Sequence, residues 1–280
     1  MIRRKTAISL LLVTSLALAG CSSLGIFDNK TTAEKIETEM NENVKTVQVN
    51  STTTQVLSIT NNNTTINQTQ QQQVRARYDY QNNSYIAQGV GSQSVIQRTQ
   101  NFAFERYFVN GTIYTKQQRQ NQSTGWQTQA TNLSVETESA PVANASFLEQ
   151  YNYTQNNSTN ESILQYSINL KENPPENTSL IEDRSFSPFD SRLDELDTYV
   201  IEIEVHKETH RLKSVKLYIQ YDMNNSELAE INPDYAAENM ELNEGEEPPR
   251  GRLTYATTLE YSQYNEPLNV SLPEEAKNQS

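Results

Sequence analysis

The feature that most constrains the fold is an alternation of apolar and polar residues through most of positions 199–222. Glu202 and Glu204 alternate with apolar neighbours, a polar turn follows at 207–210, and the alternation then resumes. Successive side chains of a β-strand point to opposite faces, so this pattern predicts a hairpin with one buried and one solvated face. The apolar positions are Tyr199, Ile201, Ile203, Val205, Val215, Leu217, Ile219 and Tyr221.

Weaker alternation along most of the chain predicts further strands. Asn110-Gly111 is the strongest hairpin signal, because both residues tolerate the positive φ of a tight turn. Gly89 and Gly91 indicate a bulge or a close backbone approach. Positions 61–63 predict a loop, and the glutamine run 70–73 is low-complexity sequence between strands. The other expected strands lie at 47–59 (one strand or two), 74–80, 85–97, 102–109, 112–119, 163–170 and 253–261, and a further short strand is expected to begin at 125–127.

Helical signals are few. Thr31 or Thr32 could cap a helix to about residue 44, and residues 140–151 could form a second, with Pro141 in its first turn. Residues 174–197 are weakly helical or irregular, and residues 223–249 hold eight acids and no base, which indicates a solvated insertion. We therefore expect an α+β fold, a single curved antiparallel half-barrel sheet of about ten strands wrapped over two or three helices.

The N-terminus carries a leader. Arg3, Arg4 and Lys5 precede an apolar run at 7–18, and Leu-Ala-Gly-Cys follows, with its cysteine at Cys21. This order resembles the lipobox of prokaryotic lipoproteins. An ordinary leader or a membrane-spanning helix with a chance cysteine is the alternative, but the run is short for a span. We expect a signal peptide over 1–20, a lipidated tether over 21–30, one domain over 31–280, and a location on the extracytoplasmic face of the cell membrane.

The composition of the chain limits the kinds of molecule it can bind and the modifications it can carry. The net charge of −13 becomes −16 once Arg3, Arg4 and Lys5 leave with the leader, so phosphate repulsion argues against nucleic acid. The lone cysteine, if lipidated, leaves no thiol for a disulfide or metal site. Asparagine begins an Asn-X-Ser/Thr sequon at 18 of 30 positions, where composition alone gives about six. Acidity and sequons together indicate an archaeal cell surface, with a Gram-positive-type bacterial lipoprotein as the alternative. The candidate glycosylation sites are Asn62, Asn82, Asn156 and Asn224.

Catalytic and metal signals are weak. His206 and His210 straddle a predicted turn in His-Lys-Glu-Thr-His, which is not the zinc motif His-Glu-x-x-His. Glu202 and Glu204 share a strand face, which is more typical of a solvated face than of a catalytic pair. The sequence contains no phosphate loop and no G-x-S-x-G motif. We expect no enzyme, no metal and no cofactor.

Three stretches resemble LolA/LppX-like lipoproteins. They are YFVNGTIYTK…GWQTQ at 107–129, YVIEIEVHKETHRLKSVKLYI at 199–219, and LEYSQYNEPLNVSLPEEA at 259–276. The resemblance implies a half-barrel sheet over helices whose cavity holds a lipid or a lipoprotein acyl chain. The long Gln/Asn segments and the acidic insertion at 223–250 depart from that pattern.

The expected function is therefore non-enzymatic binding of a lipid or other apolar ligand by a membrane-anchored lipoprotein. The alternative is a glycosylated structural or interaction lipoprotein of the cell envelope, with a filled core and no ligand. An enzyme is a third possibility. Aromatic residues of the 102–108 stripe and Trp126 fit a cavity lining and a plain sheet core equally well. The cavity candidates are Phe102, Phe104, Phe108, Trp126, Tyr199, Ile201, Ile203, Leu217 and Ile219.

Overall fold

The computed structural model describes residues 32–61, 64–95, 98–119, 122–132, 134–135, 154–156, 160–172, 196–224, 228 and 250–277. All of them belong to one compact unit, Thr31–Ser280. A helix α1 (Thr32–Thr38) continues into a π-helical turn η1 (Glu39–Asn43), where the sequence predicts a helix. The remaining elements are β1 (Thr46–Asn61), β2 (Thr64–Asp79), β3 (Ser84–Val95), β4 (Arg98–Val109), β5 (Thr112–Arg119), β6 (Gln122–Ser123), β7 (Gln127–Ala130), β8 (Thr154–Asn156), β9 (Ile163–Asn169), β10 (Thr198–His206), β11 (Leu212–Met223), β12 (Arg250–Ser262) and α6 (Glu274–Lys277).

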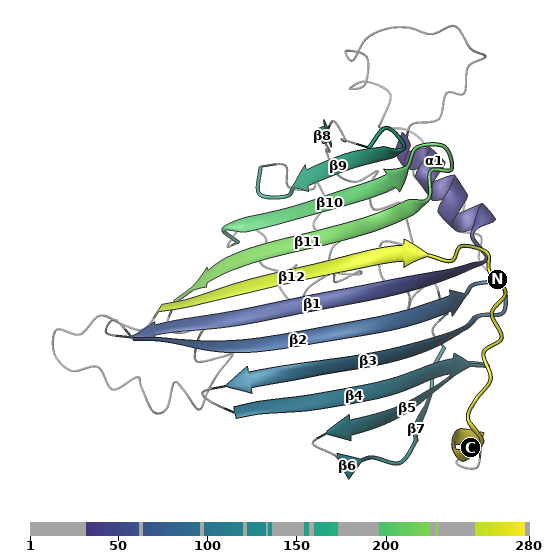
Figure 1. Ribbon diagram of the computed structural model, residues 1–280, viewed down its shortest axis with the longest axis horizontal. Coiled ribbons are helices and arrows are strands. Elements are labelled where there is room, and N and C mark those ends of the chain that lie inside the picture. Colours follow the sequence, from purple (N-terminus) through teal and green to yellow (C-terminus); the bar gives the residue numbers. More distant parts are fainter. Residues whose placement is uncertain are drawn as a thin grey trace, which may run out of the picture. The chain divides into compact units, whose positions relative to one another are not determined.

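The strands form one open antiparallel sheet of twelve strands (Figure 1). Their order is β6-β5-β4-β3-β2-β1-β12-β11-β10-β9-β8, with β7 paired to β5. Most neighbours are also consecutive in sequence, but β1 pairs with β12 from Gln48↔Ser262 to Thr60↔Arg250. The first and last strands therefore lie side by side in the middle of the sheet.

The turn signals in the sequence are confirmed. Asn110 and Gly111 join β4 to β5 with φ values of 52° and 73°, as a type I′ hairpin turn requires. Residues 207–211 join β10 to β11, and His210 there has a φ of 57°.

The glutamine run is a correction to the sequence interpretation. Residues 70–73 lie within β2, a strand of 16 residues, and pair with β1 on one side and β3 on the other. Backbone pairing on both sides holds this polar stretch extended, although its side chains have low intrinsic strand preference.

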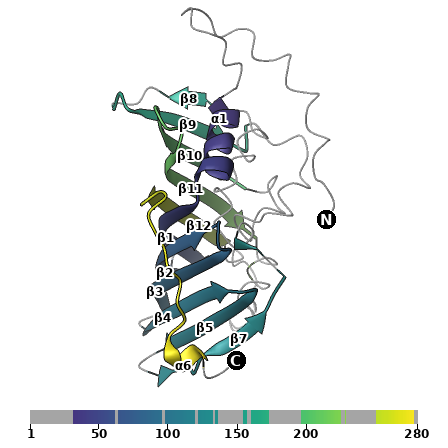
Figure 2. The ribbon, with the colours of Figure 1, turned by 90° about the vertical axis from the view of Figure 1, so that its right-hand side faces the viewer.

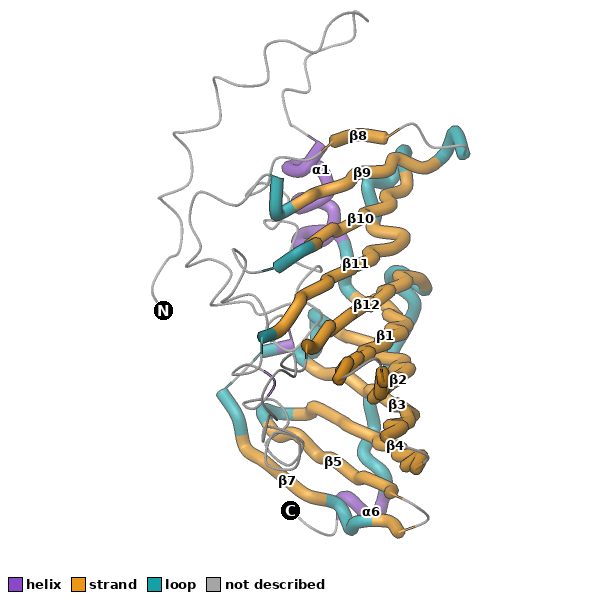
Figure 3. Tube along the Cα trace, turned by 90° about the vertical axis from the view of Figure 1, so that its left-hand side faces the viewer, coloured by secondary structure: helices purple, strands orange, loops and turns teal. Residues whose placement is uncertain are grey.

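The two faces of the sheet differ. We call core face the side that carries Tyr199, Ile201 and Ile203, and outer face the opposite side, which carries Glu202 and Glu204. Buried apolar side chains from β9–β12, β1–β4 and the η1 region form one cluster on the core face. Ile36, Met40 and Val44 join this cluster, and Figures 2 and 3 show α1 beside the β9–β11 end of the sheet.

The expected antiparallel sheet is confirmed, with twelve strands instead of about ten. In the described part of the chain, only the α1–η1 segment and the short α6 are helices of more than one residue. The helix expected at 140–151 lies outside the described residues, and so does most of the 223–250 insertion, which connects β11 to β12.

Candidate functional site

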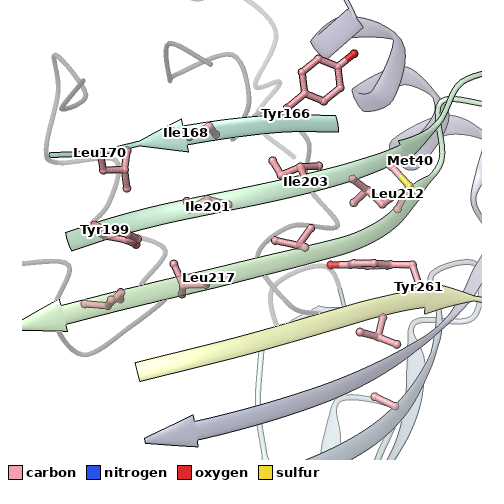
Figure 4. Packing of buried hydrophobic residues seen from close by; sticks show 14 of the residues in the cluster. Met40, Tyr166, Ile168, Leu170, Tyr199, Ile201, Ile203, Leu212, Leu217 and Tyr261 are labelled. Atoms are coloured by element: carbon pink, nitrogen blue, oxygen red, sulfur yellow. The ribbon is translucent and has the colours of Figure 1, made fainter. Parts of the chain in front are cut away.

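The cavity candidates on β10 and β11 lie in the densest part of the core. Tyr199, Ile201, Ile203, Leu217 and Ile219 are all between 0 and 4% exposed. Register explains their contact, because Ile201 lies opposite Leu217 on β11 and opposite Ile168 on β9. Figure 4 shows Ile168, Ile201 and Leu217 on neighbouring strands, with Met40 beside Leu212. This end of the core face is closed.

The phenylalanine stripe of β4 continues the core face toward the other end of the sheet. Phe108 is fully buried, whereas Phe102 and Phe104 are only half-buried. Phe104 lies opposite Gly89, and Phe102 lies opposite Gly91. A Cβ on Gly89 would come within 2.3 Å of the Phe104 ring. An aromatic ring lies in the space above each glycine. The expected close backbone approach is found at Gly91, where an added Cβ would also come within 2.6 Å of the main-chain oxygen of Gln71.

Arg106 is a functional candidate that the sequence interpretation missed. It lies on the core face between Phe104 and Phe108, directly opposite the buried Ala87. The side chain is half-buried, and its Nε atom is buried without a hydrogen-bond partner among the described residues. A signal was present, since Phe102, Phe104, Arg106 and Phe108 share one period-two register, in which a basic residue is out of place.

Trp126 lies away from the other cavity candidates, on the outer face. It packs edge-on against Tyr107, with ring centroids 5.6 Å apart, in a cluster that includes Tyr114 and Ala276. The C-terminal segment covers this cluster through Val270 and Leu272. The Lys116 Nζ lies 5.7 Å from the Trp126 ring centroid, and 3.1 Å from a carboxylate oxygen of Glu275.

Two adjoining hollows of about 730 and 820 Å³ lie on the outer face of β1–β5. Both are lined by one cross-strand row, Gln73, Val90, Ala103 and Gln118, on β2, β3, β4 and β5. Val90 and Ala103 are short, so the longer glutamines stand above them, and Val90 is 56% exposed. We call the two hollows together the outer-face groove.

The lining of the outer-face groove is polar. Arg75 is held in place by two hydrogen bonds, from Nε and Nη2, to Gln48 Oε1 at 2.9 and 2.7 Å. Gln88 donates to Glu105 at 3.4 Å. The volume of each hollow falls within the ~300–1,000 Å³ of typical ligand pockets, but those pockets are mostly apolar. Carboxamide and hydroxyl groups around a two-residue apolar floor suit a polar molecule, not a lipid chain.

Hydrogen bonds and ion pairs engage two carboxylates on β10 and β11, and the two histidines lie at the turn between these strands. Desolvation acts to raise the pKa of Glu204, but hydrogen bonds from Lys213, Gln165 and Ser214 outweigh it and lower the pKa to about 2. On β11, hydrogen bonds from the Arg252 guanidinium at 2.6 and 2.9 Å lower the pKa of Asp222. His206 ends β10, and His210 lies in the following turn. Within the described ranges, no group of three His, Cys, Asp or Glu side chains could hold a metal ion.

The predicted modification sites are spread over the chain. Asn82, Asn156 and Asn224 are exposed, whereas Asn62 and Cys21 lie outside the described residues. The Asn82 Nδ2 donates to Asp79 Oδ2 at 2.8 Å, so this carboxamide is already engaged. Over the part of the chain that the structure covers, no helix has the length and apolar character needed to cross a membrane.

Comparisons with known proteins do not assign a family. No family model matches the chain, and no curated protein matches it. A DUF1329 family protein from Desulfovibrio piger ATCC 29098 aligns over 85% of this chain and 92% of its own, with 8% identity and a TM-score of 0.26. A chain from a study of the in-meso crystallization of membrane proteins aligns over 80% of this chain and 85% of its own, with 7% identity and a TM-score of 0.15. Neither likeness is strong enough to carry a functional argument.

Proposed function

We propose that this protein is a LolA/LppX-like lipoprotein, anchored to the extracytoplasmic face of the cell membrane, that binds an apolar ligand with an acidic head group and catalyses no reaction. The observation that carries the proposal is Arg106, a cation on the apolar core face between Phe104 and Phe108. The ligand would lie on the half-barrel's core face over β2–β5.

A guanidinium among aromatic side chains is costly unless an anion pairs with it. A carboxylate or phosphate fits its planar fork of N–H donors and would satisfy the buried Nε. The apolar part of such a ligand would contact Phe102, Phe104 and Val74, which are half-buried on the same face. A charge-assisted hydrogen bond is worth about 1.5–3 kcal/mol, so the acidic group would raise affinity about 10- to 100-fold.

A second candidate is the filled-core interaction lipoprotein, and the β10–β11 end of the core face favours it. Side chains there are at most 4% exposed, which leaves no room for a ligand beside Ile201 or Leu217. The ligand-binding and the filled-core proposals make different predictions only for the β2–β5 end of the core face, where Phe102 and Phe104 are half-buried.

The test has two parts. Native mass spectrometry of the mature protein released gently from its own membranes should detect a bound amphiphile. In titrations with recombinant protein, wild type should bind oleate about 10- to 100-fold more tightly than oleyl alcohol, which has the same chain but no charge. Arg106→Met should abolish this preference.

The matched control is Arg75→Met, which removes an arginine from the outer face. It should leave the preference for oleate unchanged. Recovery of bare protein together with failure of both probes to bind would overturn the proposal in favour of the filled core. Equal preference for oleate in Arg106→Met and wild type would refute the role of Arg106.

A further inference from the structure

Among the described strands, β8 forms one edge of the sheet. β8 contributes only Thr154–Asn156, all exposed, and no described strand pairs with its far side. Neither β8 nor β9 contains a charged residue or a proline. Exposed strand edges invite pairing with a second copy, and proteins commonly prevent it with charges or prolines.

Two of the described residues at this edge are sequon asparagines. Asn156 is the last residue of β8, opposite Gln165 of β9, and Asn160 lies in the turn before β9. Each begins a sequon, Asn156-Asn157-Ser158 and Asn160-Glu161-Ser162. In the second, the backbone N–H and the hydroxyl of Ser162 donate to Asn160 Oδ1 at 3.0 and 2.7 Å. Residues 160–162 are exposed, so the acceptor asparagine and its hydroxyl partner are held together within reach of a transferase.

We infer that N-linked glycans at Asn156 and Asn160 cover the β8–β9 edge and prevent edge-to-edge pairing of two copies. A second copy would add its strand about 4.8 Å from β8. A glycan on Asn156 starts within this distance, and its bulk and hydration exclude an approaching strand. The glycans would take the role of the charged residues that β8 and β9 lack. This inference does not depend on the ligand proposed for the core face.

The test compares lipoprotein from the native host with the same chain from a host without N-glycosylation, in the same detergent. Glycopeptide mass spectrometry of the native protein should find glycan on Asn156 and Asn160, with the Asn160 glycan retained in Ser162→Thr and lost in Ser162→Ala. Analytical ultracentrifugation should show native protein as a monomer and unglycosylated protein as a dimer or larger.

A charged substitution on β8 distinguishes association through the strand edge from nonspecific aggregation. In unglycosylated protein, Thr154→Lys on β8 should restore the monomer, whereas Thr254→Lys on the outer face of central strand β12 should not. Circular dichroism checks that each variant is folded, and a Thr154→Glu variant serves if the lysine variant is not. The inference is overturned if both asparagines are bare in native protein, if unglycosylated wild type is monomeric, or if both threonine variants associate like wild type.

Discussion

Gly89 and Gly91 allow a quantitative test of aromatic packing over strand glycines. A Cβ on Gly89 would lie 2.3 Å from Phe104 Cε1 and 2.5 Å from Cζ, so Gly89→Ala requires the ring to move by about 1 Å. Overpacking of this kind costs about 1–3 kcal/mol, while replacing a strand glycine by alanine recovers about 0.5–1 kcal/mol of backbone entropy. Gly89→Ala should therefore lower the free energy of unfolding by up to about 2.5 kcal/mol.

Without the Phe104 ring, Gly89→Ala should stabilise the protein instead of destabilising it. In a Phe104→Ala background, Gly89→Ala meets no ring and should raise the free energy of unfolding by about 0.5–1 kcal/mol. The coupling energy of the double-mutant cycle then equals the clash, about 1–3 kcal/mol. Gly91 is the matched control, because its Cβ would lie 2.6 Å from the main-chain oxygen of Gln71 as well as 2.3 Å from Phe102. Phe102→Ala should therefore not rescue Gly91→Ala.

Urea denaturation followed by fluorescence measures these changes, because Trp126 is the only tryptophan and is 7% exposed. The urea concentration at the midpoint of unfolding should change, whereas the dependence of the unfolding free energy on urea concentration should stay the same. If Gly89→Ala destabilises equally with and without Phe104, the ring does not occupy the space above Gly89 and the packing argument fails.

Three further predictions concern charge, anchoring and modification. Glu204 has a pKa of about 2 in the folded protein against an ordinary 4.5, so its contribution to stability is complete above about pH 5 and is lost as the pH falls toward 2. The melting temperature of Glu204→Gln should therefore lie below that of wild type at pH 5 and approach it as the pH falls to 2. A difference in melting temperature that stays constant over this range would contradict the prediction. Cys21→Ser should lose the lipoprotein-type cut, and any Cys21→Ser protein that still reaches mature length should leave the membrane, because each buried CH₂ of an acyl chain contributes about 0.8 kcal/mol. Retention of that mature-length protein through a high-salt wash would refute the lipid anchor. Glycopeptide mapping should find higher occupancy at Asn224 than at Asn82, whose carboxamide is bound to Asp79 and whose sequon residue Ser84 is 7% exposed; equal occupancy would show that folded structure does not control modification.

The sequence by itself determined the local parts of the fold. The alternation around Ile201 and Ile203 identified a hairpin and its buried face, because side-chain direction in a strand follows from position alone. Asn110-Gly111 specified its turn for an equally local reason, since both residues accept positive φ. Five of the cavity candidates were thus correctly placed on one apolar face, although local pattern could not tell a lining from a closed core.

Only the tertiary structure decided what depends on distant neighbours. The pairing of β1 with β12 joins segments about 200 residues apart, and no periodicity specifies such a partner. The pairing of β2 with β1 on one side and with β3 on the other makes the glutamine run part of a strand. Trp126 lies between β6 and β7, outside any strand, so no alternation could assign it to the outer face. Arg106 was visible in the sequence as a basic residue among the phenylalanines of β4. The burial of its Nε, which has no hydrogen-bond partner among the described residues, depends on what packs around it.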